Sequence, residues 1–365
     1  MVDTSPFPVR LRPGTIVLRR GPGELQYGTD DRWSVLLSGL SEEEEAWLLD
    51  HDRSARPLLP APAEVRAIPP ERQHAILRHL REALLVVGQP DEVREDVTAP
   101  ARGAADAATL SLLRPDAAGH ATLSRRASAT VAIDGLGRSG VGTAVVLATA
   151  GVGTLLLDDA APVQATDVGL GGYRPRDVGM PRREAAARLL ADLAPQVRAR
   201  AVSASRWVSP HAQRPDVVVV VERRVLRPDR YGRFTGDGTP HLPVVVREAD
   251  MVVGPFVRPG RTPCVRCVEG HRADLDPQWP QLADQLRDPQ REVLDVEETT
   301  LAAVGSAIAA SQVLVHLDGL TPRAATACIE IGVPDAVPRL REVVSHPRCG
   351  CSSLTGAAAM SSGRR

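Results

Sequence analysis

Lysine is absent from this chain. All 44 basic residues are arginines, and 45 acidic residues balance them to a formal net charge of −1. This balance excludes the long-range positive field that draws nucleic acid or an anionic membrane surface to a protein. We therefore expect no nucleic-acid partner and no membrane partner. Function must come from local sites that do not depend on a lysine.

An apolar N-terminal run of the signal-peptide type is also missing, since the first residues, MVDTSPFPVRLRPG, contain proline and arginine instead. We expect a cytoplasmic protein. The uncharged stretch 139–157 is nearly long enough to span a bilayer, but the sequence Gly151-Val152-Gly153 interrupts it. This break predicts a helix followed by a buried strand of an α/β core.

No cysteine lies before residue 264. Cys264 and Cys267 in PCVRC form one closely spaced pair, and Cys349 and Cys351 in HPRCGC form another. Two such pairs supply the four thiolates of a tetrahedral zinc site, and neither pair has the strand-to-helix context of a redox dithiol. Because four thiolates leave no position open for water, the expected zinc is structural and not catalytic.

The first 88 residues predict a small domain of their own. Residues 15–40 alternate between apolar and polar side chains in three short runs, which predicts three antiparallel strands. Ser41 and Glu44 have the spacing of a capping box, and a second helix is predicted over 70–87. We interpret residues 1–88 as a winged-helix-like α+β domain for peptide recognition or, alternatively, for dimerisation. The balanced charge argues against DNA binding.

The rest of the chain predicts a Rossmann-like α/β domain. Residues 89–125 are rich in alanine, proline and aspartate and are expected to form a linker. From residue 126 the pattern becomes strand, glycine-rich turn, helix and strand, in TVAID, GLGRSG, VGTAVVLATA and GTLLLDD. Further strands and helices continue this pattern. The domain is therefore expected over 126–354, with a flexible tail over 355–365.

The turn GLGRSG has the spacing G-x-G-x-x-G. Gly135, Gly137 and Gly140 lie where a tight turn, the close approach of a phosphate and helix packing exclude a side chain. Asp158 follows at the end of the next strand, where an acidic residue can hold a ribose. By itself the motif equally fits a nicotinamide or flavin enzyme. It also fits a structural turn that no longer holds a ligand.

The residues around this turn resemble the ThiF/MoeB family of ubiquitin-activating-type proteins. The similarity covers about residues 126–354 and includes VAIDGLGRSGVGTAVVLATAGVGTLLLDD, DVGMPRREAAARLL and both cysteine pairs. It implies adenylation of a sulfur-carrier or ubiquitin-like protein with ATP and magnesium, beside a structural four-thiolate zinc. Under this resemblance Asp158 matches the ribose-binding acid, and Arg182 matches the family's phosphate-binding lysine.

Several positions depart from the family's pattern. Where the family has an asparagine and an arginine that contact ATP, this sequence has Asp167 and Leu170. Where the family has a magnesium-binding aspartate, the run VVVVVERR offers Glu222 followed by Arg223, and a cation there repels the metal. Arginine at position 182 keeps the positive charge but cannot donate a proton.

A closer similarity accounts for these losses. GTIVLRRGPGELQYGTDDRWSVLLSGLS and HPRCGC resemble the cyclodehydratase partner protein of thiazole/oxazole-modified peptide (bacteriocin) biosynthesis. In that family a winged-helix element binds the leader of a ribosomal precursor peptide, and a degenerate ThiF-like domain presents it to a YcaO-type ATPase. The resemblance implies that a leader adds a strand beside the third strand and touches the second helix. The residues so implied are Arg32, Trp33, Ser34, Val35, Leu36, Leu37, His74 and Leu77.

Three functions fit the sequence. The first is a non-catalytic, zinc-stabilised scaffold, a homodimer by family resemblance, that binds a precursor peptide and activates an enzyme in trans. The second is a working adenylyltransferase that holds ATP and magnesium. Its nucleotide-binding residues would be Gly135, Gly137, Gly140, Asp158, Arg182 and Glu222. The third, a nicotinamide oxidoreductase, has only the glycine-rich turn in its favour, and the lost ATP contacts favour the scaffold.

Overall fold

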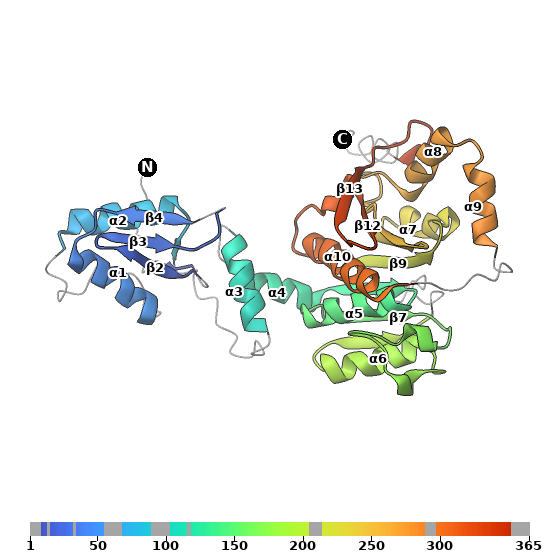
Figure 1. The fold of residues 1–365 in the computed structure, drawn as a ribbon, viewed down its shortest axis with the longest axis horizontal. Coiled ribbons are helices and arrows are strands. Elements are labelled where there is room, and N and C mark those ends of the chain that lie inside the picture. Colours follow the sequence, from blue (N-terminus) through green and yellow to red (C-terminus); the bar gives the residue numbers. More distant parts are fainter. Residues whose placement is uncertain are drawn as a thin grey trace, which may run out of the picture. The chain divides into compact units, whose positions relative to one another are not determined.

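The computed structural model divides into two compact units, Met1–Leu123 and Ser124–Arg365 (Figure 1). It describes residues 9–12, 15–31, 34–54, 68–88, 103–114, 118–203, 214–288 and 297–351. The expected tail over 355–365 lies outside the described residues. Each unit has its own buried apolar core.

The N-terminal unit is built on a three-stranded antiparallel sheet in the order β2-β3-β4. The strands are β2 (Val17–Gly21), β3 (Glu24–Tyr27) and β4 (Val35–Ser38), and the helices after them are α1 (Glu42–Ser54) and α2 (Pro70–Glu82). Leu25, Tyr27 and Leu37 share one buried cluster with residues of both helices. The three strands predicted from the alternation are confirmed, because this cluster buries one face of the sheet.

The helices of this unit begin as predicted, but the second one ends earlier. The N–H of Ser41 donates to the Glu44 carboxylate over 3.0 Å, and the N–H of Glu44 donates to the Ser41 hydroxyl over 3.2 Å, which confirms the capping box. Helix α2 ends at Glu82, and Leu84 then adopts a left-handed backbone with φ of 57°. The chain continues as β5 (Val86–Gly88), which pairs antiparallel with β1 (Val9–Leu11). The last turn of the predicted helix is therefore wrong, because its β-branched valines extend as a strand.

The expected linker, 89–125, contains helix α3 (Ala104–Leu113) and the start of helix α4 (Gly119–Ser128). Helix α3 packs in the N-terminal unit, where the Arg12 guanidinium donates to the Leu112 carbonyl over 3.0 Å. Alanine, which made this stretch look like a linker, is also the residue with the highest helix propensity. The composition that suggested a linker is therefore equally that of a helix.

The C-terminal unit contains a mixed eight-stranded sheet in the order β13-β12-β11-β10-β9-β6-β7-β8. The strands from β10 to β8 in this order are parallel, and β11, β12 and β13 extend the sheet antiparallel. The bounds are β6 (Thr130–Asp134), β7 (Thr154–Asp158), β8 (Arg198–Ala201), β9 (Val217–Arg223), β10 (His241–Val246), β11 (Asp250–Val253), β12 (Ala327–Gly332) and β13 (Pro338–Glu342). This parallel-rich sheet confirms the predicted α/β class.

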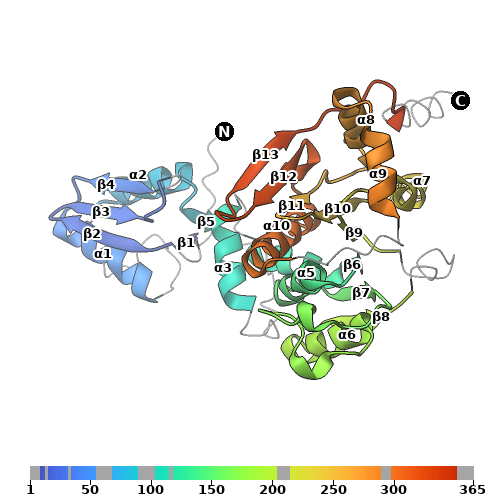
Figure 2. The same cartoon turned by 45° about the vertical axis from the view of Figure 1, so that its right-hand side comes forward.

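Helices cover both faces of this sheet (Figure 2). They are α5 (Arg138–Thr149), α6 (Arg182–Leu193), α7 (Gly232–Gly236), α8 (Val265–Leu275), α9 (Trp279–Arg287) and α10 (Thr299–Leu317). One face packs against α5, α6 and α10, and the other packs against α7 and α8. Because successive strand residues point to opposite faces, β6, β7 and β9 are buried on both sides and read as continuous apolar runs.

The apolar segments of this unit are core elements. The uncharged stretch 139–157 forms most of α5 and β7, as predicted. Helix α10 is long and apolar enough to cross a membrane by length and composition, but it packs along α5. A Cβ on Gly142 of α5 would lie only 2.4 Å from the Ser306 hydroxyl of α10. Glycine at this position therefore allows the two helices to approach closely.

The direction of chain progression across the sheet reverses between β6 and β9. From β6 the chain continues through β7 to β8 on one side, and from β9 it continues to β10 on the other. At such a reversal the connections after the two strands diverge and leave a crevice at their carboxyl ends. The glycine-rich turn follows β6, and Glu222 and Arg223 end β9. The fold therefore brings both predicted nucleotide motifs to one crevice.

Candidate functional site

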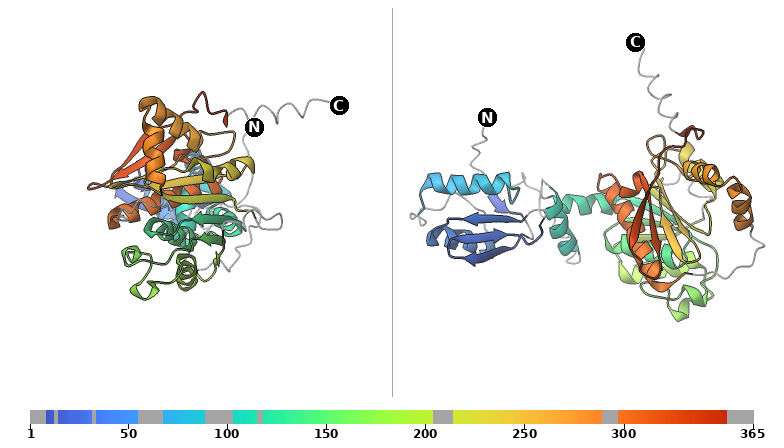
Figure 3. Two further views of the ribbon diagram at one scale, coloured as in Figure 1. Left: turned by 90° about the vertical axis from the view of Figure 1, so that its right-hand side faces the viewer. Right: turned by 45° about the horizontal axis from the view of Figure 1, so that its top comes forward.

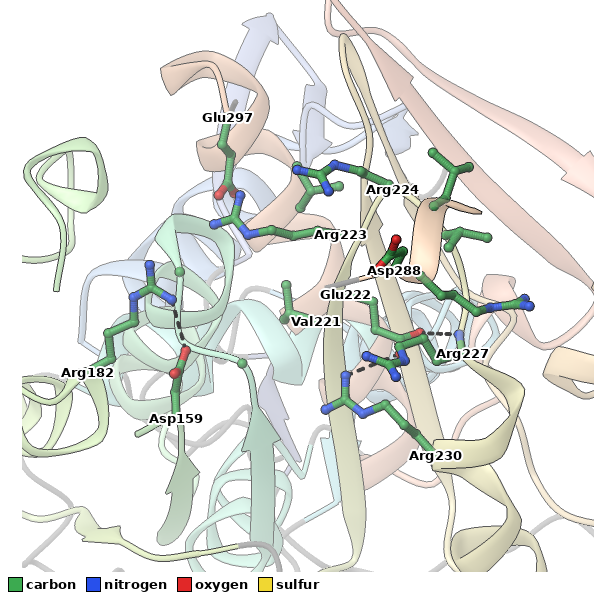
Figure 4. Close-up of a pocket in the computed structure, with 16 residues that line it drawn as sticks. Asp159, Arg182, Val221, Glu222, Arg223, Arg224, Arg227, Arg230, Asp288 and Glu297 are labelled. Carbon is green, nitrogen blue, oxygen red and sulfur yellow. Dashed lines mark hydrogen bonds and ion pairs between the residues drawn. The ribbon is translucent and has the colours of Figure 1, made fainter. Parts of the chain in front are cut away.

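A cavity of about 300 Å³ lies at this crevice (Figure 4). Its charged lining residues are Asp159, Glu222, Asp288, Glu297, Arg182, Arg223, Arg224, Arg227, Arg230 and Arg287. Gly135 and Gly137 of the glycine-rich turn line it as well. Six arginines therefore face four carboxylates in a space of the size that binds small ligands.

Two glycines of the glycine-rich turn are required for steric reasons. Gly135 has a φ of 96°, and a Cβ there would lie 2.6 Å from the Val221 carbonyl oxygen. A Cβ on Gly140 would lie 2.0 Å from the Gly135 carbonyl oxygen. Both contacts are far shorter than van der Waals distance. Gly135 and Gly140 are therefore required by the fold whether or not a nucleotide is bound.

The two aspartates after β7 have different surroundings. Asp159 lines the cavity, and its carboxylate accepts the Leu136 N–H over 2.9 Å. Asp158, the expected ribose ligand, is not among the lining residues, although its carbonyl oxygen accepts the Gly135 N–H over 2.9 Å. Consecutive residues at a strand end point in different directions. The sequence Asp-Asp could not indicate which of the two reaches the cavity.

Arg182 lies in the cavity, as the resemblance implied, but two carboxylates hold it there. Its guanidinium is 2.7 Å from Asp167 and 3.2 Å from Asp159, and the residue is only 9% exposed. Burial lowers the pKa of Arg182, but the hydrogen bond and charge of Asp167 outweigh burial and raise it. By the family resemblance, Asp167 stands in place of an asparagine. Its carboxylate and that of Asp159 neutralise the charge of the Arg182 guanidinium.

Glu222, a candidate magnesium ligand, is engaged within the protein. Its buried carboxylate accepts the Tyr231 hydroxyl over 2.8 Å, the Arg227 N–H over 3.1 Å and the Arg230 guanidinium over 3.2 Å. Burial raises the pKa of Glu222, although these three partners lower it. Arg223 extends into the cavity, with a guanidinium nitrogen 3.0 Å from the position of a Cβ on Gly137 (Figure 4). Arg223 therefore brings a positive charge into the cavity.

Glu297 occupies the amino end of helix α5. Its carboxylate accepts the Ser139 N–H over 2.9 Å and forms a short hydrogen bond with the Ser139 hydroxyl. The Arg138 guanidinium donates to the Glu297 carbonyl over 2.9 Å, and Figure 4 shows Arg223 directed at the Glu297 carboxylate. Burial raises the pKa of Glu297, while the bonds from Ser139 and the charge of Arg223 lower it.

This position is significant because the helix after a glycine-rich turn is where Rossmann folds bind phosphate. A carboxylate of the chain itself stands there in place of a ligand anion. Sequence analysis missed Glu297, since no motif surrounds it and 158 positions separate it from Ser139. Only the tertiary fold brings the two together.

The four cysteines of the predicted zinc site converge in the C-terminal unit. The Sγ atoms of Cys264 and Cys349 are 3.4 Å apart, those of Cys267 and Cys351 are 3.4 Å apart, and those of Cys264 and Cys267 are 3.9 Å apart. All are free thiols. A tetrahedral zinc with Zn–S bonds of ~2.3 Å requires sulfur atoms about 3.8 Å apart. The cluster therefore fits a metal ion such as zinc.

The surroundings of this cluster determine how readily its thiols ionise. Burial raises the pKa of the Cys351 thiol to about 11 and that of Cys264 further, so these thiols ionise only beside a positive charge. Burial also opposes ionisation of Cys267, but backbone N–H groups, first that of His346, lower its pKa. The His346 ring bonds to Asp274 over 2.9 Å. This contact holds the turn that carries the second cysteine pair.

The residues implied in peptide contact belong to the N-terminal unit, and Arg32 and Trp33 lie outside the described residues. Ser34 precedes β4, which contains Val35, Leu36 and Leu37. Leu37 and Leu77 share the buried cluster, whereas Leu36 is 43% exposed and His74 is exposed on α2. Strand β4 is an edge strand beside β3. The structure thus places the described residues of this set in or next to one edge strand and on one helix.

Comparisons with known proteins agree with this geometry. Residues 111–223 match the ThiF family, and a search of curated proteins found no match. Escherichia coli MccB solved with MccA has a TM-score of 0.68 at 18% identity, and the alignment covers 94% of this chain and 99% of that one. MccB solved with ATP has a TM-score of 0.67 at 16% identity, with coverage of 94% and 99%. PaaA has a TM-score of 0.65 at 17% identity, with coverage of 90% and 98%.

The chain therefore contains a ThiF-family segment, which confirms the family resemblance. It shares the fold of MccB and PaaA over nearly the whole length of each.

Proposed function

We propose that this protein is a non-catalytic ThiF-fold scaffold that binds a precursor peptide through its N-terminal unit and presents it to a YcaO-type ATPase. Zinc at Cys264, Cys267, Cys349 and Cys351 stabilises the C-terminal unit. One observation carries the non-catalytic part of this proposal. The groups in the cavity that would bind magnesium and ATP are engaged by other groups of the same chain.

Binding of magnesium-ATP would have to break these contacts. A phosphate would displace Glu297 from Ser139 or compete with Asp159 and Asp167 for Arg182. Each hydrogen bond to a charged group contributes about 1.5–3 kcal/mol, and the displaced carboxylates would stay close to the phosphates and repel them. The cavity therefore disfavours nucleotide.

Binding of the magnesium ion is opposed by a second set of contacts. The Glu222 carboxylate is already engaged by hydrogen bonds from Tyr231 and Arg230. Arg223 repels a divalent cation from the position where the family binds it. ATP without its magnesium would place its full negative charge beside Asp159 and Glu297, whose repulsion offsets part of the attraction of the lining arginines.

The peptide-binding part of the proposal rests on β4 and on the fold comparison. An edge strand can accept an extended peptide through backbone hydrogen bonds, while side-chain pockets supply selectivity. The likeness to MccB solved with MccA supports a peptide partner for this chain. The sequence similarity to cyclodehydratase partner proteins supports a YcaO-type client, because a scaffold without nucleotide chemistry needs an ATPase in trans. The ThiF resemblance also leads us to expect a homodimer, measurable by sedimentation.

A working adenylyltransferase is the second candidate, because the glycine-rich turn and the cavity are both retained. Titration of the zinc-loaded protein with ATP and magnesium, followed by calorimetry, separates the two functions. We expect no binding at millimolar ATP. Micromolar binding would contradict the scaffold and favour adenylation, which exchange of labelled pyrophosphate into ATP would then test with candidate carrier proteins.

A further inference from the structure

Strand β4 presents an open edge with a small apolar row beside it. Within the described residues no strand pairs with its outer edge. Leu36 of β4 lies opposite Gln26 of β3, which lies opposite Leu18 of β2. Leu36 and Leu18 are 43% and 40% exposed. An added strand would therefore find backbone partners along β4 and apolar neighbours on the outer face of the sheet.

The flank of helix α2 that faces away from α1 is basic. Helix α2 lies on the β4 side of the sheet and α1 on the β2 side (Figures 1 and 3). The Arg72 guanidinium donates to Glu44 over 2.8 Å and to the Gly39 carbonyl over 3.0 Å, which holds one flank of α2 toward α1. His74, Arg78 and Arg81 are all exposed on the opposite flank.

The spacing of these three residues makes a continuous stripe. Positions 74, 78 and 81 are separated by four and three residues, so they lie above one another on one side of a helix. Arg78 and Arg81 have no ion-pair partner among the described residues. By the same helical geometry the exposed acids of α2, Glu71 and Glu82, lie on its solvent-facing crest, next to Arg78. The cations therefore line the flank of α2 that faces away from α1, and the acids border that flank on its solvent side.

We propose that the peptide bound by the N-terminal unit is acidic where it passes α2. This inference rests on the proposed peptide-binding function and specifies its substrate class. A strand added to β4 directs alternate side chains toward the helix side of the sheet. Aspartate or glutamate at those positions lies within reach of Arg78 and Arg81.

Nucleic acid fits this stripe less well than an acidic peptide does. Two arginines and a histidine span only two helical turns, and the acidic first turn of α1, Glu42 to Glu45, belongs to the same unit. A phosphate backbone needs a longer run of cations. A peptide strand also uses the open edge of β4, which a nucleic acid leaves unpaired.

The test is a binding screen with the full-length, zinc-loaded protein against an array of random peptides of strand length. Three proteins are compared: the wild type, the double variant Arg78→Glu/Arg81→Glu, and Arg20→Glu. Arg20 is exposed on β2 at the opposite edge of the sheet, so it is a matched control for charge reversal. Circular dichroism checks that each variant is folded, and a labelled duplex DNA and an RNA are tested as competitors.

We expect the wild type to select peptides with acidic residues at alternate positions. The double variant should bind the best acidic peptide about tenfold more weakly, since exposed ion pairs are modest contributors, and should shift its preference to basic peptides. Arg20→Glu should change neither. Peptide binding without a charge preference, or a preference that survives in the double variant, would overturn the acidic-peptide inference and leave the scaffold proposal intact. No binding to any peptide would overturn both, and displacement of peptide by the oligonucleotides would replace the acidic peptide with nucleic acid.

Discussion

Replacing Glu297 with alanine tests whether this carboxylate stands in for a ligand anion. The substitution removes the acceptor of the Ser139 N–H and hydroxyl at the amino end of α5. It also removes a negative charge that interacts with Arg223 in the cavity. The variant therefore keeps the hydrogen-bond donors of an anion site at the amino end of α5 but has no anion bound to them.

The size of the effect follows from these contacts. Hydrogen bonds to a charged acceptor contribute about 1.5–3 kcal/mol, and relief from burying the carboxylate offsets part of this. We expect the free energy of unfolding to fall by about 2 kcal/mol. For a unit of this length that corresponds to a loss of about 4–8 °C in Tm. An external anion at a hundred times its Kd would return about 2.7 kcal/mol.

The assay is thermal unfolding with and without inorganic pyrophosphate at constant ionic strength. Pyrophosphate should raise the Tm of Glu297→Ala by several degrees and leave the wild type unchanged. Glu298→Ala is the matched control, because Glu298 caps α10 through the Leu301 N–H over 2.9 Å and, within the described part of the chain, makes no hydrogen bond to α5. The control should lose about 1 kcal/mol and show no response to pyrophosphate.

Two results would refute this reasoning. If pyrophosphate stabilised the wild type as much as the variant, the anion site would be open in the native protein and Glu297 would not block it. If pyrophosphate stabilised neither protein, the amino end of α5 would not be an anion site. In the second case the turn would be purely structural.

Two further predictions concern the C-terminal unit. Cys264→Ser should reduce bound zinc from one equivalent and lower the Tm, while Cys328→Ala, a change at a cysteine in the apolar core, should keep the metal; unchanged zinc by atomic emission in Cys264→Ser would contradict the four-thiolate site. Burial lowers the pKa of His241 to about 4 from 6.5, so below pH 6.5 the unfolded chain takes up a proton that the folded chain does not. Stability should therefore fall by about 3 kcal/mol between pH 6.5 and 4, and His241→Phe should lose correspondingly less in urea unfolding at the two pH values. Equal losses in both proteins would show that His241 is not responsible.

The sequence was sufficient to predict structural features that depend on residues close together in the chain. The capping box of Ser41 and Glu44 needs only a spacing of three residues, and Gly135 and Gly140 of the turn are required by the backbone around them. Continuous valine and leucine runs revealed strands buried on both faces. The cysteine pairs indicated a metal cluster because each pair is local. The prediction failed where two local signals disagreed. At Val86 and Val87 helix periodicity indicated a helix, whereas the propensity of valine indicated the strand that the structure has.

The state of the cavity was decided by tertiary structure alone. From the sequence, Arg182 and Glu222 were available ligands, yet Asp167, Asp159, Tyr231 and Arg230 engage them. Pairings of this kind depend on which side chains the fold brings within hydrogen-bond distance, and no spacing rule encodes them.

By itself, then, the sequence determined the α/β class, the glycine-rich turn and the cysteine cluster, since local sterics and periodicity govern each of these. Only the tertiary structure decided that Asp159 and not Asp158 lines the cavity and that Glu297 occupies the amino end of α5. The same holds for the orientation of α2, which depends on Arg72 reaching Glu44 across the unit. These contacts join residues far apart in the chain, and their energies exist only once the sheet and helices have packed.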